Sequence, residues 1–202
     1  MRHLTANDFQ VSTWSGGKTV QIAISPEGAA YAERNFLWRV SSATVELDES
    51  AGGEDAASCR PAGTKASCLS VFTALPDYHR WIFPLSGTMS LSHNGGPVQT
   101  LKPHEAHFFD GADATHCRGR CTDFNLMLRK GRCEGRILAL TEDAELGGKG
   151  VKVLYCAQGS VTVNGLFLRE GEAARLDEGE RGRVHFPSPG VVAAAVISEK
   201  QA

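Results

Sequence analysis

Asp123-Phe124-Asn125-Leu126-Met127 alternates polar and apolar side chains within a strand-like stretch of the sequence. In a strand, positions 123, 125 and 127 point to one face and positions 124 and 126 to the other. A strand that lines the inside of a small, ligand-holding barrel carries polar groups on its inner face in this way. The alternative is a solvent-facing strand whose Phe124 and Leu126 pack inward. The segment therefore predicts either a ligand-lining strand or a strand with one face in water.

Composition excludes several classes of partner. The chain has 202 residues, enough for one large domain or two small ones, and its net charge is only −2. Without a basic stripe we expect no nucleic-acid partner. No apolar run approaches the roughly 18 residues that span a bilayer, so we expect no membrane partner. The first ten residues lack the apolar region of a signal peptide, which predicts a cytoplasmic protein.

The six cysteines predict buried thiols rather than a zinc site. Cys117 and Cys121 are four residues apart, and the sequence contains no Cys-x-x-Cys spacing. In a reducing compartment such thiols act as small hydrophobic side chains. We therefore expect neither a disulfide nor a structural metal from them.

The strand and turn pattern predicts an all-β protein. Short runs rich in β-branched and aromatic residues alternate with Gly, Pro, Asn and Asp, and no segment shows a sustained helical period. The expected strands are 20–24, 36–45, 79–85, 88–92 and 106–110. Turns are expected at Leu85–Met89 and His93–Gly96, joining antiparallel neighbours.

The second half repeats the rhythm of the first. In both halves a strand leads through a Gly turn to a second strand, and an Asn-Gly turn then leads to a third. Two related β-units packed together would produce this order, although any meander has a similar rhythm. Residues 48–67 interrupt it with small, polar, turn-rich sequence, which predicts a mobile insertion.

Five ordered motifs resemble the HutD/Ves family of bicupins. They cover roughly residues 5–135, and the last third is similar only to a generic cupin half. The motifs are Trp14–Thr19, Trp38–Ala43, Leu75–Arg80, Phe109–Gly111 and Asp123–Met127. Two features depart from the family pattern: the insertion at 48–67, and Ser15 and Lys18 where many members carry a longer Lys-Asn-Gly-Gly-Gly run.

The resemblance implies a fold and a class of function. It implies two packed cupin-like β-barrels or sandwiches in one chain, which we divide into residues 1–135 and residues 136–202. It implies a cytoplasmic, bacterial protein linked to histidine utilisation or stress responses. Members are thought to bind a small organic acid such as formylglutamate or urocanate and have no established catalytic activity. A homodimer is left open.

The histidines do not have the spacing of a metal-dependent cupin. Such a site takes His-x-His, then Glu, then a third His from adjacent strands. Here His104 and His107 are three residues apart, so they face opposite sides of a strand, and His116 follows nine residues later. A bend near Pro103 would be needed to bring them together. We expect no metal and no cofactor.

Two arginines in apolar surroundings predict an anion site. Arg39 and Arg80 each lie within strand-like apolar sequence, and a buried charge requires a partner. That partner is either a ligand carboxylate, which a guanidinium binds through two parallel hydrogen bonds, or Asp110 and Asp123 as internal ion pairs. The predicted ligand-binding residues are Trp14, Arg39, Ser41, Tyr78, Arg80, Asp110, Asp123, Asn125 and Met127.

Binding without turnover is the function that these features predict. The protein would sense or regulate the level of a small organic acid. The alternative is a metal-independent cupin isomerase or hydrolase that uses Asp123 or Asp110 as a general base. A metal-dependent dioxygenase and a purely structural interaction module are more distant alternatives. Product formation from the bound acid separates the enzyme from the binder.

Overall fold

Every regular element of the computed structural model is a β-strand. The structure describes residues 1–14, 17–46 and 70–200. Within these ranges the chain forms three antiparallel sheets and no helix, which confirms the all-β prediction. The predicted insertion at 48–67 lies outside the described residues, as do Cys59 and Cys68.

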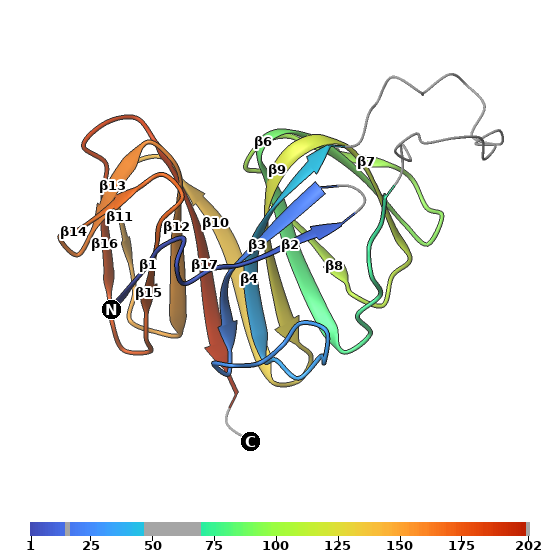
Figure 1. Ribbon diagram of the computed structural model, residues 1–202, viewed down its shortest axis with the longest axis horizontal. Helices are drawn as coiled ribbons and strands as arrows, with labels where there is room; N and C mark the ends of the chain where they lie inside the picture. Colours follow the sequence, from blue (N-terminus) through green and yellow to red (C-terminus); the bar gives the residue numbers. More distant parts are fainter. Residues whose placement is uncertain (15–16, 47–69, 201–202) are drawn as a thin grey trace.

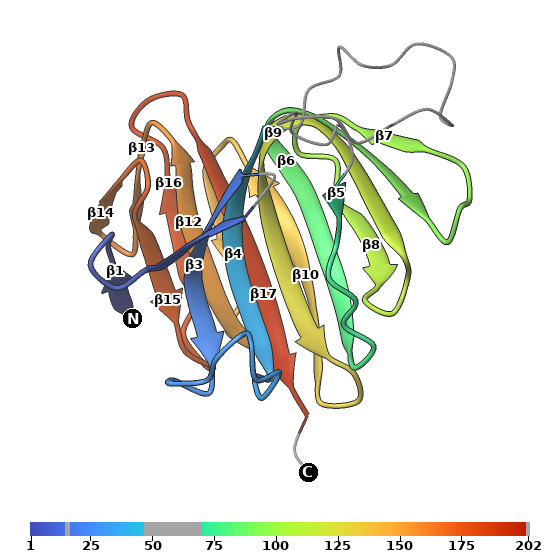
Figure 2. The ribbon, with the colours of Figure 1, turned by 45° about the vertical axis from the view of Figure 1, so that its right-hand side comes forward.

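The largest sheet holds eight strands from the first two thirds of the chain and curves around an interior (Figures 1 and 2). Its main order is β2-β3-β4-β9-β6-β7, with β5 paired to β9 and β8 paired to β6. The strands are β2 Gln10–Trp14, β3 Gly17–Ser25, β4 Trp38–Glu46, β5 Ser70–Val71, β6 Tyr78–His93, β7 Gln99–Leu101, β8 His107–Asp110 and β9 Thr115–Arg129.

The other two sheets face each other as a sandwich. A five-stranded sheet contains β1 Arg2–Leu4, β15 Ala173–Leu176, β12 Val151–Gln158, β17 Val191–Glu199 and β10 Cys133–Leu140, in that order. A four-stranded sheet contains β11 Ala144–Leu146, β16 Gly182–His185, β13 Ser160–Val163 and β14 Leu166–Arg169. In the described part of the chain no pairing joins β2 to β7, so the eight-stranded sheet does not close, and the prediction of two barrels is not confirmed.

The N-terminal strand pairs with the C-terminal half of the molecule. β1 pairs with β15 although the N-terminal residues lead directly into β2 and β3 (Figure 1). β10 pairs with β17 along its whole length. The domain boundary at residue 135 stays a prediction, but strand pairing places both β1 and β10 with the C-terminal sheet.

The predicted turn at Leu85–Met89 is wrong, because β6 runs through it as one long strand. Its register against β9 shifts between Pro84 and Ser86, where proline has no N–H to donate to the ladder. Gly87 follows with φ of 73°, and a Cβ there would lie 2.1 Å from the carbonyl oxygen of Arg120. The sequence Pro-Leu-Ser-Gly therefore makes a bulge that bends the strand. The turn at His93–Gly96 is confirmed, with Asn94 and Gly95 both at positive φ.

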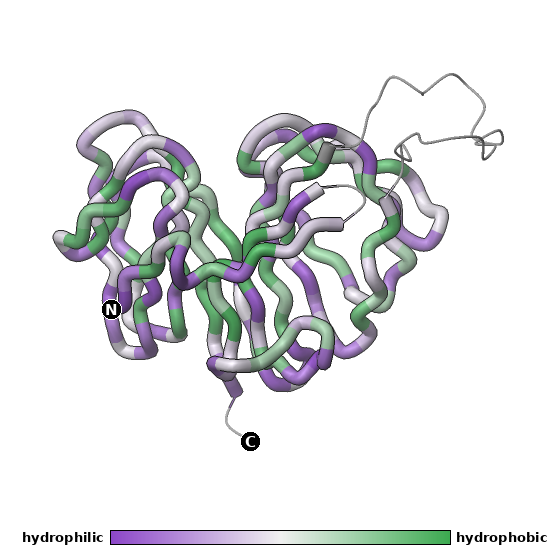
Figure 3. The backbone as a smooth tube through the Cα atoms, in the orientation of Figure 1, coloured by the Kyte–Doolittle hydropathy of each residue, from purple (hydrophilic) through white to green (hydrophobic). Residues whose placement is uncertain are grey.

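An apolar core joins the two halves. It combines side chains from the outer face of the eight-stranded sheet, such as Trp38, Phe124 and Leu126, with Val153, Ala195 and others from the five-stranded sheet. Hydrophobic residues accordingly follow the strands at this junction (Figure 3). A second apolar core fills the C-terminal sandwich. The eight-stranded sheet thus has its outer face buried and leaves its inner face for other side chains.

Candidate functional site

Strand register brings the predicted residues together on the inner face of the eight-stranded sheet. Arg39 on β4 lies opposite Met127 on β9, and Met127 lies opposite Arg80 on β6. The next row of the same face is Ser41, Asn125 and Ile82. Asp123 belongs to the row after that, opposite Ala43. Residues 40 to 90 positions apart in the sequence therefore meet because β9 is central and pairs on both edges.

The segment Asp123–Met127 is buried on both faces. Phe124 and Leu126 pack into the core between the two halves, with no exposed surface. Asp123, Asn125 and Met127 lie on the opposite face and are also buried, at 3%, 6% and 4% exposure. The solvent-facing alternative for this strand is therefore wrong, and the polar face lines the interior.

Arg39 is held by neutral side chains. Its Nε donates to Oε1 of Gln21 at 2.7 Å, and one terminal nitrogen donates to Oγ of Ser41 at 3.2 Å. Its Cζ lies 4.7 Å from the ring centroid of Tyr31, a cation–π contact. Burial lowers the pKa of this guanidinium, which stays charged at neutral pH because an arginine loses its proton only far above it.

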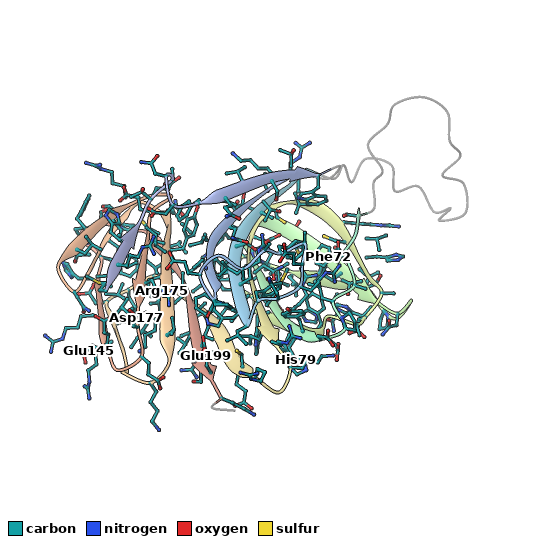
Figure 4. The ribbon with its side chains drawn as sticks, turned by 60° about the horizontal axis from the view of Figure 1, so that its bottom comes forward. Phe72, His79, Glu145, Arg175, Asp177 and Glu199 are labelled. Atoms are coloured by element: carbon teal, nitrogen blue, oxygen red, sulfur yellow. The ribbon has the colours of Figure 1, made fainter. Side chains whose placement is uncertain are left out.

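Arg80 lies against two aromatic rings. Its Cζ is 4.6 Å from the ring centroid of Phe72 and 5.0 Å from that of Phe109. Its Nε is buried and has no hydrogen-bond partner among the described residues. Burial lowers the pKa of Arg80 to about 10, so the side chain is a cation at neutral pH. Figure 4 shows Phe72 among the side chains gathered inside the curled sheet.

Neither guanidinium has a carboxylate within 4.0 Å among the described residues. Asp110 instead accepts from Nζ of Lys130 at 2.6 Å, away from Arg39. Asp123 lies close enough to Arg80 for each to shift the pKa of the other, but the two form no ion pair. The internal ion pairs considered from sequence, Arg39 with Asp110 and Arg80 with Asp123, are therefore not formed.

Asp123 and Asn125 each present an unused acceptor. Oδ1 of Asp123 and Oδ1 of Asn125 are buried, and neither has a hydrogen-bond partner in the part of the chain that the structure describes. Burial raises the pKa of Asp123 to about 7, although Arg80 and the backbone amide of Ala43 lower it in part. Three polar atoms of one small region, including Nε of Arg80, thus lack partners, and buried polar atoms are normally satisfied by protein, water or ligand.

Three predicted residues have other contacts. The Tyr78 hydroxyl lies 2.8 Å from the carbonyl oxygen of Arg34 and 2.9 Å from that of Phe36, and donates its one proton to either of them. Trp14 packs at the rim and donates Nε1 to Oγ1 of Thr19 at 3.2 Å. Asp110 lies with Lys130, as described above. The structure groups Arg39, Ser41, Tyr78, Arg80, Asp123, Asn125 and Met127 on one face, with Tyr78 one row beyond Arg80, and leaves Trp14 and Asp110 around it.

Sequence reasoning missed four side chains that contact the arginines. Tyr31, Phe72 and Phe109 supply the aromatic surfaces, and Gln21 holds Arg39. Phe109 had a signal, since it stands beside Asp110 in a quoted motif and at an inward position of β8. Tyr31 comes from the irregular segment between β3 and β4, which has no period from which to predict its direction.

A histidine pair lies farther along the same inner face. Nε2 of His93 and Nε2 of His107 are 2.9 Å apart, and Nδ1 of His93 is 2.9 Å from Oγ1 of Thr115. The ring centroids are 5.1 Å apart, close to the nitrogen separation plus two ring radii, so the nitrogens meet nearly head-on. This is the geometry of one N–H···N hydrogen bond. Burial lowers the pKa of both rings, which keeps the pair neutral near pH 7.

The described residues do not bring together three or more His, Cys, Asp or Glu side chains that could hold a metal ion. His107 contacts His93 instead of the His104 and His116 considered from sequence. His104 lies beside Phe83, with its Nε2 buried and unpartnered. The inside of the C-terminal sandwich is lined mainly by apolar side chains, and its buried Lys152 donates Nζ to the carbonyl oxygen of Glu180 at 2.7 Å. The larger group of buried polar side chains belongs to the first half.

Comparison with known proteins places this fold. The chain matches the HutD family over residues 6–51 and 65–194, most of its length. The chain belongs to the HutD family. Among curated proteins, no sequence gives a significant match.

Solved structures agree with this assignment. HutD from Pseudomonas fluorescens is 20% identical, with a TM-score of 0.76 and 99% of each chain covered. A conserved protein of unknown function from Pseudomonas aeruginosa is 23% identical, with a TM-score of 0.73 and 99% of each chain covered. The pirin YhhW from Escherichia coli, solved with nickel(II), is 11% identical, with a TM-score of 0.62 and coverage of 96% and 97%. These likenesses establish a HutD-like, cupin-type fold and nothing about a ligand.

The described part of this HutD-family chain contains no helix that could cross a membrane. The cytoplasmic location inferred from the N-terminal sequence stays a prediction.

Proposed function

We propose that this HutD-family protein binds a small organic acid between Arg80 and Arg39 and acts as a sensor or regulator without chemical turnover. The observation that carries the proposal is positive charge without a counterion: two buried guanidinium groups, with no carboxylate within 4.0 Å in the described chain. A buried unpaired charge is costly, and an acid carboxylate would offset that cost.

The hydrogen-bonding atoms of the site indicate which functional groups the acid must carry. A carboxylate would take the free Nε of Arg80. The unused oxygens of Asn125 and Asp123 accept hydrogen bonds, so the rest of the ligand would donate an N–H or O–H to them. Formylglutamate and urocanate, the acids implied by the family resemblance, each combine a carboxylate with an N–H. The aromatic rings of Phe72, Phe109 and Tyr31 would give the ligand flat apolar surfaces.

The pKa of Asp123 supports the enzyme as a second candidate. A carboxyl with a pKa of about 7 is suited to general acid or base catalysis near neutral pH. Asp110 is not suited to this role, because the hydrogen bond from Lys130 lowers the pKa of its carboxyl and holds the carboxylate in place. Incubating the protein with N-formyl-L-glutamate or urocanate and assaying products separates the candidates, since a binder leaves the acid unchanged over hours.

Replacement of Arg80 tests the binding proposal. The thermal stability of the wild-type protein should rise with N-formyl-L-glutamate, urocanate or formate, by about 2.7 kcal/mol at a hundred times the dissociation constant. The solved HutD from Pseudomonas fluorescens is described in a formate condition, so formate is a reasonable smallest acid to try. Arg80→Met should abolish this stabilisation while leaving the unliganded stability unchanged or raised, because it removes a buried charge.

The matched control is Arg183→Met, at an exposed arginine that pairs with Glu145. It makes the same change of charge far from the interior and should keep the acid-induced stabilisation. A large loss of unliganded stability in Arg80→Met with binding retained would show that Arg80 is structural and would refute the proposal.

A further inference from the structure

A cavity of about 160 Å³ opens where the two halves of the molecule meet. It is lined by residues of β1, β2, β3 and β15, and by the turn after β3. Among them are Arg2, Gln10, Gln21, Ile24, Glu27 and Arg175. Figure 4 labels Arg175 on the five-stranded sheet, the side of the cavity that faces away from the arginine site.

The edge of β3 explains why the cavity is there. β2 pairs with β3 only from Gly17 to Gln21, so the remainder of β3 has no strand beside it on that edge. The register of β3 against β4 also shifts between Gln21 and Ala23. The bulge and the end of the β2 ladder coincide at Gln21, so beyond this residue β3 is the edge of the sheet beside the cavity.

Gln21 belongs to both the cavity and the arginine site. Its Oε1 accepts from Nε of Arg39 at 2.7 Å, and its Nε2 donates to Oε1 of Gln10 at 3.1 Å. Ile24, another cavity residue, is the direct cross-strand neighbour of Arg39. A long, uncharged glutamine side chain therefore separates the cavity from the first guanidinium, and two hydrogen bonds hold it in place.

The cavity lining carries equal numbers of cations and anions. Its cations are Arg2 and Arg175, and its anions are Asp8 and Glu27. Arg2 bonds both carboxylates. Arg175 lies 3.2 Å from Asp177, although its buried Nε has no hydrogen-bond partner among the described residues. The lining therefore offers an incoming acid one cation, Arg175, before the acid reaches Arg39 and Arg80.

We propose that this cavity is the entrance by which the acid reaches Arg39 and then Arg80, with the Gln10–Gln21 pair as its gate. Rotation of the Gln21 side chain breaks two hydrogen bonds and exposes Nε of Arg39 to the cavity, where the acid carboxylate replaces the glutamine oxygen. This inference rests on the proposed function, because it concerns the route to the same site. A gate alters how fast the acid enters and leaves without altering its equilibrium affinity.

A bulky label in the cavity tests the route. Gln10→Cys places a thiol at the exposed end of the Gln10–Gln21 pair, and a neutral maleimide attached there would fill the cavity mouth. Association of urocanate and N-formyl-L-glutamate would be followed by stopped-flow tryptophan fluorescence. Labelled Gln10→Cys should show association and dissociation rates at least tenfold lower than the unlabelled variant, with the dissociation constant changed less than twofold.

Ser12→Cys is the matched control, because Ser12 is exposed two residues along the same face of β2 and is outside the cavity lining. Labelled Ser12→Cys and maleimide-treated wild type should keep their rates. Unchanged rates in labelled Gln10→Cys, with binding still lost in Arg80→Met, would overturn the entrance and leave the binding site intact. Failure of both acids to bind unlabelled wild type would defeat the proposed function and the entrance together.

Discussion

At the scale of single residues, the site depends on two opposite charges that are buried near each other without pairing. Burial raises the pKa of Asp123 to about 7 and lowers that of Arg80 to about 10. Near neutral pH, Arg80 and Arg39 are charged while Asp123 is partly protonated. The interior therefore keeps net positive charge, which is the physical basis for expecting an acid there.

Asp123→Asn should remove a pH-dependent loss of stability. In the unfolded chain Asp123 releases its proton near its ordinary pKa of 3.8, whereas the folded protein holds the proton until about pH 7. The unfolded state therefore gains stability relative to the folded state as pH rises through this window, and the penalty is complete above it. In urea unfolding, the free energy of unfolding of Asp123→Asn should exceed that of the wild type by more at about pH 8 than at about pH 4. If the difference in free energy of unfolding did not vary with pH, the pKa of Asp123 would be the same in the folded and unfolded states, which would contradict this prediction.

At the scale of elements, the sequence patterns predicted which side chains share a face of a strand better than they predicted where a strand begins and ends. Alternation correctly assigned Asp123, Asn125 and Met127 to one face, because β9 has period two throughout. The same reasoning divided β6 at Ser86-Gly87, since a glycine bulge and a hairpin turn use the same residues. Tyr31 and Phe72 could not be predicted as site residues, because they come from irregular or very short segments whose direction depends on tertiary packing.

Gly111, in the quoted Phe109-Asp110-Gly111 motif, should tolerate no side chain. Gly111 follows β8 directly. Its N–H donates to the carbonyl oxygen of Tyr78, the first residue of β6, and its carbonyl oxygen accepts from the amide of Leu75. A Cβ would lie 2.4 Å from the oxygen of Leu75 and 2.6 Å from that of Tyr78. Gly111→Ala should therefore lower the free energy of unfolding by about 1–3 kcal/mol. Gly147→Ala, where a Cβ meets nothing within 4 Å, is the control and should change it little. Equal changes in the free energy of unfolding in the two variants would show that the backbone near Gly111 moves to accept a Cβ without a loss of stability.

At the scale of the whole molecule, the two halves have different interiors. One encloses two arginines, an aspartate and other polar side chains, whereas the other is mainly apolar, although it also contains the buried Lys152. The family resemblance and the internal repetition of strands and turns predicted two cupin-like halves, which the open eight-stranded sheet does not confirm. Neither indicated that β1 would join the C-terminal sheet, because three residues carry too little pattern to choose between two available edges.

The C-terminal strand should contribute to stability through Glu199. Its Oε1 accepts from Nε1 of Trp38 at 2.7 Å and from Oγ of Ser25 at 3.1 Å, and so ties β17 to β4 and β3. Glu199→Ala would leave the indole N–H of fully buried Trp38 without its acceptor, at a cost of about 1–3 kcal/mol in chemical unfolding. Glu134→Ala, which breaks an exposed pair with Lys200, should cost less than about 1 kcal/mol. Comparable losses in the two variants would mean that Glu199 does not hold the halves together.

The most direct test of anion binding by Arg80 is a crystal structure with 3-bromobenzoate, a carboxylate whose aryl bromine does not alkylate thiols and is located by anomalous scattering. A bromine peak is expected inside the eight-stranded sheet between Arg39 and Arg80, with a carboxylate oxygen within hydrogen-bonding distance of Nε of Arg80. An interior without bromine, in which Nε of Arg80 bonds a protein carboxylate, would contradict it.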